Sequence, residues 1–445
     1  MTPPDARWRA AEYIGSKVAW NRLYRAVSYL RSSLWIVPFL AIVLVLMLVP
    51  VLRLLDAWLG WRLVGLGAPG AQALYQSVIT LALSFMVFTF GSLLVAIQIA
   101  SGQLTPRIIA TTLLRDNVVR YSVGLFVFSL VFAIMALNRL ENSVHEIVSL
   151  MAALLGIACM AAFLFLIDYA ARLLRPVSIL ARVGNEGLAV IKSVYPLQGA
   201  GTVDAAEAFV EPRETHRRIV RHTGTSEIVL AVDLATLVRE AQRADGIIEF
   251  VPEVGDFVAT DEPLFMVYGG SGAIDDRRLR ATVALGTERT MEQDPLFSFR
   301  IMVDIALKAL SPAINDPTTA VLAIDQIHRL LRVVGNRQLR GAAIRDERGQ
   351  LRVVFRTPNW EDFVNLACNE IRYCGASNVQ IARRMRAMFD NLIASLPPHR
   401  HAALDEERQR LDRMLESFYR IPEDLALARV PDSQGLGGSP GRLSR

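Results

Sequence analysis

Cysteine and lysine are both scarce in this chain of 445 residues. The three cysteines, Cys159, Cys368 and Cys374, form no CxxC pair, which argues against a disulfide framework and a cysteine-type zinc site. The phosphate-binding pattern GxxxxGK[ST], the zinc pattern HExxH and the nucleophile pattern GxSxG are also missing. The sequence therefore predicts neither an enzyme nor a bound cofactor or metal.

Charged residues are rare in the first third of the chain. Residues 1–167 carry 12 of the 48 Lys and Arg residues and 6 of the 43 acidic ones, so residues 168–445 carry 36 and 37. A mean hydropathy of +0.33 is too high for an ordinary soluble protein. These values predict a membrane part followed by a soluble part. The balanced charge of the soluble part excludes a nucleic-acid partner.

Four uncharged runs are long enough to cross a bilayer, which takes about 20 apolar residues in a helix. We expect spans at about 32–54, 71–100, 121–138 and 147–167, which together make a transmembrane domain over 32–167. The first run lacks a small-residue cleavage site, so a signal peptide is not expected. The predicted fold class is a membrane α-helical domain followed by a cytosolic α+β domain, with the lipid bilayer as a partner.

The short loops predict the orientation, because basic residues collect on the cytoplasmic side of a membrane. One side has only Arg53, Arg62 and Arg139. The basic residues on the other side are Arg7, Arg9, Lys17, Arg22, Arg25, Arg31, Arg107, Arg115, Arg120, Arg172, Arg175 and Arg182. Both termini are therefore expected in the cytoplasm. The preference for Arg over Lys suggests a bacterial genome, and hence the inner membrane.

Residues 1–31 precede the first span and contain an amphipathic segment. Trp20, Leu23, Val27 and Leu30 share one helical face, with arginines on another face. Such a helix either lies on the inner leaflet as an interfacial helix or packs on the cytosolic domain. The sequence leaves both interpretations open.

The part after the spans divides into a juxtamembrane connector over 168–223, an α+β domain over 224–430 and a disordered tail over 431–445. Short β-branched runs alternate with turn signals over Gly246–Gly270, which resembles half of a biotinyl/lipoyl-type β-barrel. Such carrier domains present a lysine, and no lysine lies between 193 and 307. We therefore predict a small barrel-like unit with a structural or ligand-sensing role, followed by a helical C-terminal part.

Periodicity and turn signals predict the other elements of this domain. The expected elements are strand Glu227–Val232, helix Leu234–Arg243, strand Gly246–Val251, helices Pro295–Leu310 and Pro317–Val333, a hairpin of Ala342–Ile344 with Leu351–Arg356, and helices near Trp360–Tyr373, Val379–Leu396 and His401–Tyr419. Asp294-Pro295 and Asp316-Pro317 each combine an N-cap with a proline at the first helical position.

A charged stripe runs along the helix expected at Pro295–Leu310. Its members are Arg300, Asp304 and Lys308, and nearly every other position of the helix is apolar. So apolar a helix should be largely buried, and its charges should then meet partners such as Glu288 and Arg289. This candidate cluster is interpreted either as a ligand site or, in our preferred interpretation, as a salt-bridged core or subunit interface.

A polar stripe runs along the second span. Its members are Ser77, Thr80, Ser84, Gly91, Gln98, Ser101 and Thr105. Such a face either lines a polar pathway in an oligomer or allows close packing of helices. We therefore expect a homo-oligomeric channel-like or transport protein whose cytosolic domain gates or assembles it. The alternative is a membrane-anchored sensor or scaffold without a pore, whose ligand the sequence does not name.

The run ERT…QDP…VDIALKALSPAINDP within Gly286–Leu331 is the most distinctive part of the sequence. Together with RSSLWIVP (Arg31–Pro38), VAIQIASGQLTPR (Val95–Arg107) and the GDFV turn, it resembles a large family of bacterial predicted membrane proteins, filed as a domain of unknown function. The resemblance covers nearly the whole chain. It implies four spans and a cytosolic domain, but no activity or catalytic residues.

Overall fold

The computed structural model describes residues 20–33, 35–59, 65–103, 116–138, 140, 144–173, 175–195, 217–270, 274–339 and 343–438. The chain folds into two compact units. The bundle unit is Tyr29–Ile179, and the α/β unit combines Met1–Ser28 with Leu180–Arg445. The chain passes between the units twice, within helix α2 (Trp20–Ser32) and within helix α7 (Pro176–Val194).

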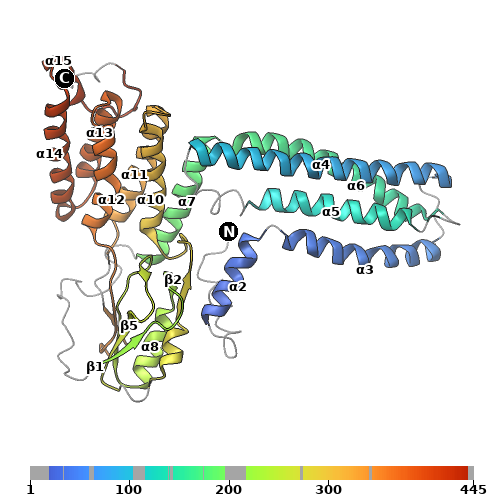
Figure 1. Ribbon diagram of the computed structural model, residues 1–445, viewed down its shortest axis with the longest axis horizontal. Helices are drawn as coiled ribbons and strands as arrows, with labels where there is room; N and C mark the ends of the chain where they lie inside the picture. Colours follow the sequence, from blue (N-terminus) through green and yellow to red (C-terminus); the bar gives the residue numbers. More distant parts are fainter. Residues whose placement is uncertain are drawn as a thin grey trace. The chain divides into compact units, whose positions relative to one another are not determined.

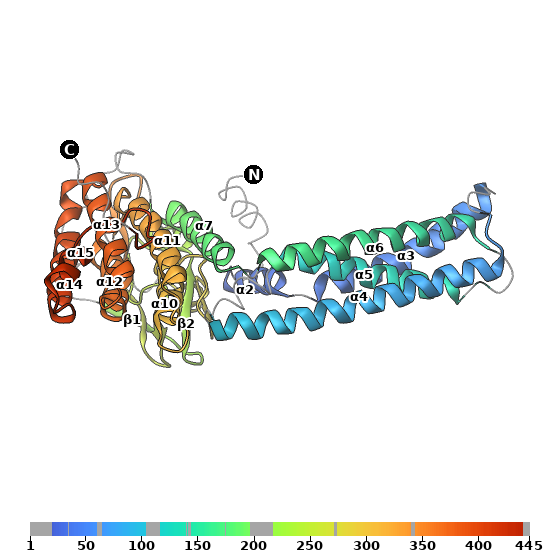
Figure 2. The ribbon, with the colours of Figure 1, turned by 90° about the horizontal axis from the view of Figure 1, so that it is seen from above.

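The bundle unit contains four helices that are long and apolar enough to cross a membrane, and they lie side by side (Figures 1 and 2). They are α3 (Ile36–Leu59), α4 (Ala68–Gln103), α5 (Asn117–Leu137) and α6 (Glu146–Leu173). The predicted number and order of spans are confirmed at this level of length and composition. Helix α5 begins before the predicted Tyr121, because the Asp116 carboxylate caps it by accepting from the Val118 and Val119 amides.

Helix α5 is the most buried helix of the bundle unit and contacts α3, α4 and α6. Its side chains are accordingly more buried than those of the other three, 44% of its apolar window against 17% for α4. Phe126 and Phe132 of α5 are fully buried. Between α4 and α6, the buried hydroxyls of Tyr75 and Ser149 are hydrogen-bonded over 2.8 Å. This buried polar pair in an otherwise apolar region is thus satisfied within the bundle.

The strands of the α/β unit form a five-stranded sheet in the order β1-β5-β3-β8-β7 and a three-stranded sheet in the order β4-β2-β6. Their bounds are β1 Arg217–Arg221, β2 Glu227–Val232, β3 Ile247–Phe250, β4 Phe257–Val258, β5 Pro263–Tyr268, β6 Val283–Gly286, β7 Ala343–Arg345 and β8 Leu351–Phe355. Helix α8 (Leu234–Arg243) contacts β3 and β8. Its buried Leu237 and Ala241 join the apolar core of the sheet.

The prediction of a barrel-like unit over Gly246–Gly270 is wrong. Strands β3 and β5 belong to one sheet and β4 to the other, and neither sheet closes within the ranges that the structure describes. Strand β3 instead pairs in parallel with β8, where Ile248 lies opposite Val353. That partner is about a hundred residues away in the sequence, so the turns around β4 could not reveal it.

Part of α2 packs on the three-stranded sheet. Tyr24 is buried together with Leu230, Ala231 and Ala284. The amide of Asn21 donates to the Ala281 carbonyl over 3.2 Å. The described start of α2 therefore packs on the α/β unit, which was one of the two interpretations of this amphipathic segment.

The helices of the α/β unit gather beside its strands (Figure 1). Their bounds are α9 Asp276–Arg280, α10 Pro295–Leu310, α11 Pro317–Gly335, α12 Trp360–Gly375, α13 Val379–Ser395, α14 His401–Phe418 and α15 Pro422–Ala428. The two Asp-Pro starts behave as predicted: Asp294 accepts from the Phe297 amide, and Asp316 accepts from the Thr319 amide. Helix α10 contacts α11 and α12, and its apolar faces are buried between them.

Two glycines let α7 approach α10 and α11 closely. A Cβ built on Gly184 would lie 2.5 Å from the Gln326 Oε1 atom of α11. A Cβ on Gly187 would lie 2.8 Å from the Cβ of Ser298, which is itself fully buried in α10. Gly187 therefore needs glycine, because a larger residue would meet the fixed Cβ of Ser298 and push α7 away from α10. At Gly184 a larger residue would displace the movable end of the Gln326 side chain.

The tail predicted to be disordered is ordered as far as Gly438. Asp432 accepts hydrogen bonds from the amides of Gln434, Gly435 and Gly437. The buried Arg383 guanidinium of α13 donates to the Gly438 carbonyl over 2.7 Å. These bonds hold a segment whose Gly/Ser/Pro composition by itself indicates disorder. Residues 439–445 lie outside the described part.

Candidate functional site

A cavity of about 370 Å³ opens in the α/β unit beside the start of α10. The end of α7, strands β2, β3 and β8 and the loop before α10 all contribute to it. Its lining residues are Ser193, Val194, Tyr195, Val232, Leu234, Phe250, Val254, Glu292, Gln293, Asp294, Pro295, Phe355, Arg356, Thr357 and Pro358. Polar groups on an apolar wall are typical of small-molecule sites.

Asp294 is the most deeply placed acid of this cavity, with 4% of its surface exposed. Its Oδ1 atom accepts from the Phe297 amide over 3.1 Å and so caps α10. The buried Oδ2 atom accepts no hydrogen bond from any residue that the structure describes. Burial raises the pKa of this carboxyl to about 6, against the opposing attraction of Arg289.

Arg289 lies next to Asp294 but directs its hydrogen bonds elsewhere. Its Nε and Nη2 atoms donate to the Gly255 carbonyl over 2.9 and 2.6 Å, whereas Nε is 3.6 Å from the Asp294 Oδ2 atom. Gly255 has a φ of +99°, and a Cβ there would lie 2.5 Å from both Arg289 and Asp294. The glycine of the GDFV turn therefore leaves the space that these two side chains occupy.

Tyr195 brings a second buried polar group to the cavity. Its side chain is 1% exposed, and its hydroxyl has no hydrogen-bond partner among the described residues. Burial raises the pKa of this hydroxyl, and the charges of Asp294 and Glu253 raise it further. The ring packs edge-on against Phe363, which fixes the position of the hydroxyl.

The electrostatic surroundings of the cavity are acidic. Burial raises the pKa of the Glu253 carboxyl, and the nearby Asp256 and Asp362 raise it further, while Arg356 lowers it. Glu292 is another carboxylate of the lining. Among the residues that the structure describes, no group of three His, Cys, Asp or Glu side chains could hold a metal ion. The arrangement is suited to binding an organic molecule by hydrogen bonds and charge.

The structure does not bring the five residues of the candidate charged cluster together. Arg300 and Asp304 are joined over 2.7 Å, and Arg300 also donates to Glu370 of α12 over 3.1 Å. Both stripe residues are only partly buried, since their side chains are 21% and 20% exposed. Lys308 is exposed. The stripe is therefore a partly solvated ion-pair network, which contributes little to stability.

The two proposed partners of that stripe lie elsewhere. Glu288 is exposed, and Arg289 bonds Gly255 as described above. The apolar residues of helix α10 are buried as expected, whereas its charged edge is exposed or only partly buried. The spacing of apolar residues thus predicted the burial of α10 correctly. It could not show that the charged residues lie at the solvent-exposed edge of the helix.

The polar stripe of α4 faces away from the bundle core. Its described side chains are exposed on the surface of the bundle unit, namely Ser77, Thr80, Ser84, Gly91 and Gln98. The hydroxyls of Ser77 and Thr80 donate to the Ala73 and Gln76 carbonyls of their own helix. The side chain of Ser101 and the whole of Thr105 lie outside the described residues. Within one chain, this stripe therefore lines no internal pathway.

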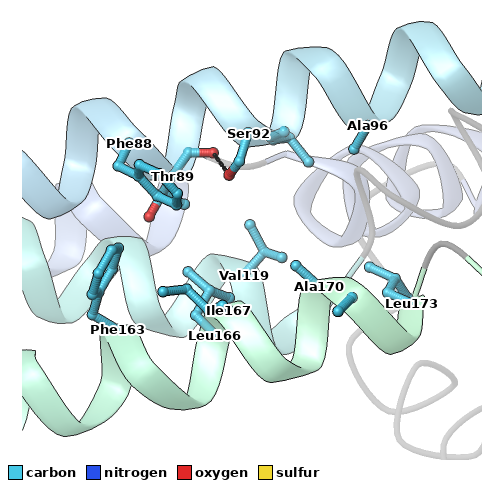
Figure 3. Close-up of a pocket in the computed structure, with 12 residues that line it drawn as sticks. Phe88, Thr89, Ser92, Ala96, Val119, Phe163, Leu166, Ile167, Ala170 and Leu173 are labelled. Atoms are coloured by element: carbon cyan, nitrogen blue, oxygen red, sulfur yellow. Dashed lines mark hydrogen bonds between the residues drawn. The ribbon is translucent and has the colours of Figure 1, made fainter.

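A second cavity, of about 210 Å³, lies between α4, α5 and α6 in the bundle unit. Figure 3 shows Phe88, Ala96, Phe163 and Leu166 around it. Its hydroxyls are already satisfied, because Thr89 donates to Phe85 and Ser92 donates to Thr89. This pocket is therefore apolar in character and offers little hydrogen bonding to a polar ligand.

Sequence reasoning recognised Asp294 as a helix cap but missed it and Tyr195 as cavity residues. The distance along the chain between α7 and α10 explains this, since only the folded unit brings them to one place. The only hint in the sequence is the run Gln293-Asp294-Pro295. Two polar residues stand there directly before a helix that is almost entirely apolar, and such a local departure from the pattern can mark a functional position.

The comparisons with known proteins identify a family and uncharacterised relatives. A model of the family described as "Predicted membrane protein (DUF2254)" matches residues 31–391. An uncharacterised protein of Mycobacterium tuberculosis, Rv1290c, is 25% identical over 450 residues, which cover 96% of this chain and 85% of that protein. The uncharacterised protein Mb1321c of Mycobacterium bovis matches to the same extent.

No solved structure matches the chain significantly. The family model covers most of the chain, including all four apolar helices and the residues around the cavity. The chain therefore belongs to the family of predicted membrane proteins described as DUF2254.

Proposed function

We propose that the protein is a membrane-anchored ligand-binding protein of the sensor type. In this proposal a small molecule binds in the α/β-unit cavity, and the four apolar helices anchor the chain in the bacterial inner membrane. The arginine bias of the loops supports a cytoplasmic position for both termini and hence for the cavity. We further propose that the protein is no enzyme, because it presents no known catalytic pattern.

One observation carries the proposal. Asp294 and Tyr195 both line the cavity, and the Asp294 Oδ2 atom and the Tyr195 hydroxyl are buried without a hydrogen bond to the described chain. Buried polar groups in folded proteins are almost always hydrogen-bonded, and leaving one unpaired costs about 1–3 kcal/mol. A ligand that supplies the missing partners would recover this free energy on binding.

Filling the cavity tests the proposal. Val254→Trp places a large ring in the lining, whereas Phe257→Trp changes a nearby side chain that is 64% exposed. The full-length protein in nanodiscs is incubated with the small-molecule fraction of a bacterial extract, and its melting temperature is measured. We expect stabilisation of the parent and of Phe257→Trp, but not of Val254→Trp. Equal shifts for all three, or no shift for the parent, would contradict ligand binding in this cavity.

The outward polar stripe favours a second candidate, a channel-like homo-oligomer. The Gln98 amide has two donors and an acceptor, and it is exposed on the bundle surface. An amide that faces lipid is unsatisfied, so association of several copies around α4 would give this face either water or a neighbouring helix. The polar pathway would then lie between chains.

Cysteine accessibility distinguishes a pathway from plain packing. Ser84→Cys, Gly91→Cys and Gln98→Cys are made in a chain freed of Cys159, Cys368 and Cys374, with Phe90→Cys as an exposed position off the stripe. A water-soluble thiol reagent should label the stripe positions and spare Phe90→Cys if a pathway exists. Uniform protection of all four positions would exclude the channel in the state tested.

A further inference from the structure

We propose that the cavity binds an organic cation, a protonated amine or amidine group carried on an apolar body. This inference rests on the proposed function and names the chemical class of its ligand. The carboxylate of Asp294 and the hydroxyl of Tyr195 would accept hydrogen bonds from the cationic head. The apolar lining would contact the rest of the molecule.

The charges around the cavity favour a cation. The acidic groups in or beside it are Asp294, Glu292, Glu253, Asp256 and Asp362. The basic groups are Arg289, Arg356 and Arg337, whose guanidinium donates to the Tyr195 carbonyl over 3.1 Å. Arg356, Asp256 and Asp362 are exposed, so water screens their charges. The less exposed groups are the acids Asp294, Glu292 and Glu253 and the bases Arg289 and Arg337, which leaves one negative charge in excess. An anionic ligand would add to an existing excess of negative charge, whereas a cation would reduce it.

Arg289 does not neutralise Asp294 fully. Its hydrogen bonds go to the Gly255 carbonyl, and it approaches the Asp294 Oδ2 atom only to 3.6 Å. The Asp294 Oδ2 atom is buried away from water, and a charge-assisted hydrogen bond to a carboxylate oxygen is strong in such an environment. The Asp294 carboxylate therefore retains the capacity to accept an N–H group from a ligand.

The remaining lining defines the body of the ligand. Val232, Leu234, Phe250, Val254 and Phe355 contribute an apolar wall, with two aromatic rings among them. Aromatic faces attract cations, and apolar walls favour hydrocarbon. A compact aliphatic or aromatic ammonium ion matches both properties, while a bare inorganic cation would leave this wall uncovered.

Binding should depend on pH through Asp294. Burial raises the pKa of its carboxyl to about 6, so the group is mostly protonated at pH 5 and mostly ionised at pH 7.5. Primary amines stay protonated over this range. A cation should therefore bind more tightly at pH 7.5 than at pH 5, whereas a neutral or anionic ligand should show no such gain.

The test uses three matched sets of probes on the full-length protein in nanodiscs. The cations are butylammonium, cyclohexylmethylammonium and 2-phenylethylammonium, and each is compared with the alcohol and the carboxylate of the same skeleton. Affinity is measured by calorimetry, and hydrogen exchange of the segments around Tyr195 and Asp294 locates the binding. We expect binding of at least one ammonium ion, protection of both segments and little effect of the alcohols and carboxylates.

Asp294→Asn should weaken ammonium binding at least 30-fold, because the neutral amide keeps the helix cap but loses the charge. Asp316→Asn is the matched control, since Asp316 caps α11 after the same Asp-Pro pattern and lies outside the cavity lining. This control should bind like the parent.

The outcomes separate the two proposals. Carboxylates or alcohols that bind with protection of Tyr195 and Asp294 would overturn the cation class and leave ligand binding in place. Ammonium binding that Asp294→Asn does not weaken would overturn the role of the carboxylate. If no ammonium ion binds, the cation class is overturned, and the cavity-filling experiment then decides on the proposed function by itself.

Discussion

Asp294→Asn is expected to raise the free energy of unfolding of the α/β unit at pH 7.5 by up to about 3 kcal/mol. Burial raises the pKa of this carboxyl from 3.8 to about 6, so its ionised form is disfavoured in the folded protein. An asparagine retains the oxygen that accepts from the Phe297 amide, and so retains the cap of α10. The same change should weaken ammonium binding at least 30-fold, so stability and ligand affinity would move in opposite directions.

The sign of the pH dependence is fixed by this raised pKa. The folded state binds the proton more tightly than the unfolded state, so the contribution of Asp294 to stability is complete below about pH 4 and is lost as the pH rises through about 6. The advantage of Asp294→Asn should therefore be greatest at pH 7.5 and disappear at pH 4. Hydrogen exchange of α10 in the full-length protein measures it, with Asp316→Asn as the control. An advantage of the same size at both pH values would refute desolvation of the carboxylate as its cause.

Gly187→Leu is expected to destabilise the α/β unit by about 3 kcal/mol, the upper range for overpacking of a filled core. Even a Cβ at this position would lie 2.8 Å from the Cβ of Ser298, and Leu330 lies at 3.3 Å. Helix α7 must then move away from α10 and α11. Ala189→Leu places the same side chain at an exposed position of α7 and should change stability little.

Thermal unfolding of both α7 variants in nanodiscs measures the difference. A melting temperature of Gly187→Leu equal to that of Ala189→Leu would mean that α7 is not docked on α10 through this glycine. Hydrogen exchange should in addition show faster exchange in α7 and at the start of α10 in Gly187→Leu alone.

The features that follow from local chemistry were predictable from the sequence. Helices α10 and α11 begin at Pro295 and Pro317 as predicted, because an aspartate cap and the fixed φ of proline act within one turn. The apolar helices of the bundle unit follow from run length alone. Strand β2 and helix α8 also have the predicted bounds.

The features that depend on distant partners were not predictable. Strand β1 lies in a stretch interpreted as a connector, and it exists as a strand because it pairs with β5, with Ile219 opposite Met266. The order of residues 431–438 depends on Arg383, which is about fifty positions earlier. The cavity was not predictable for the same reason, since Tyr195 and Asp294 come together only after the α/β unit has folded.

Helix α7 also has a mechanical consequence. It begins at Pro176, shortly after α6 ends at Leu173, and its far end contributes Ser193 and Val194 to the cavity. Its 19 residues give a rod about 28 Å long, and the glycine contacts hold that rod against α10 and α11. A helix transmits torsion along its whole length, whereas a flexible linker would dissipate it. A displacement of the Ser193 end of α7 would therefore be carried along the continuous helix to its start at Pro176.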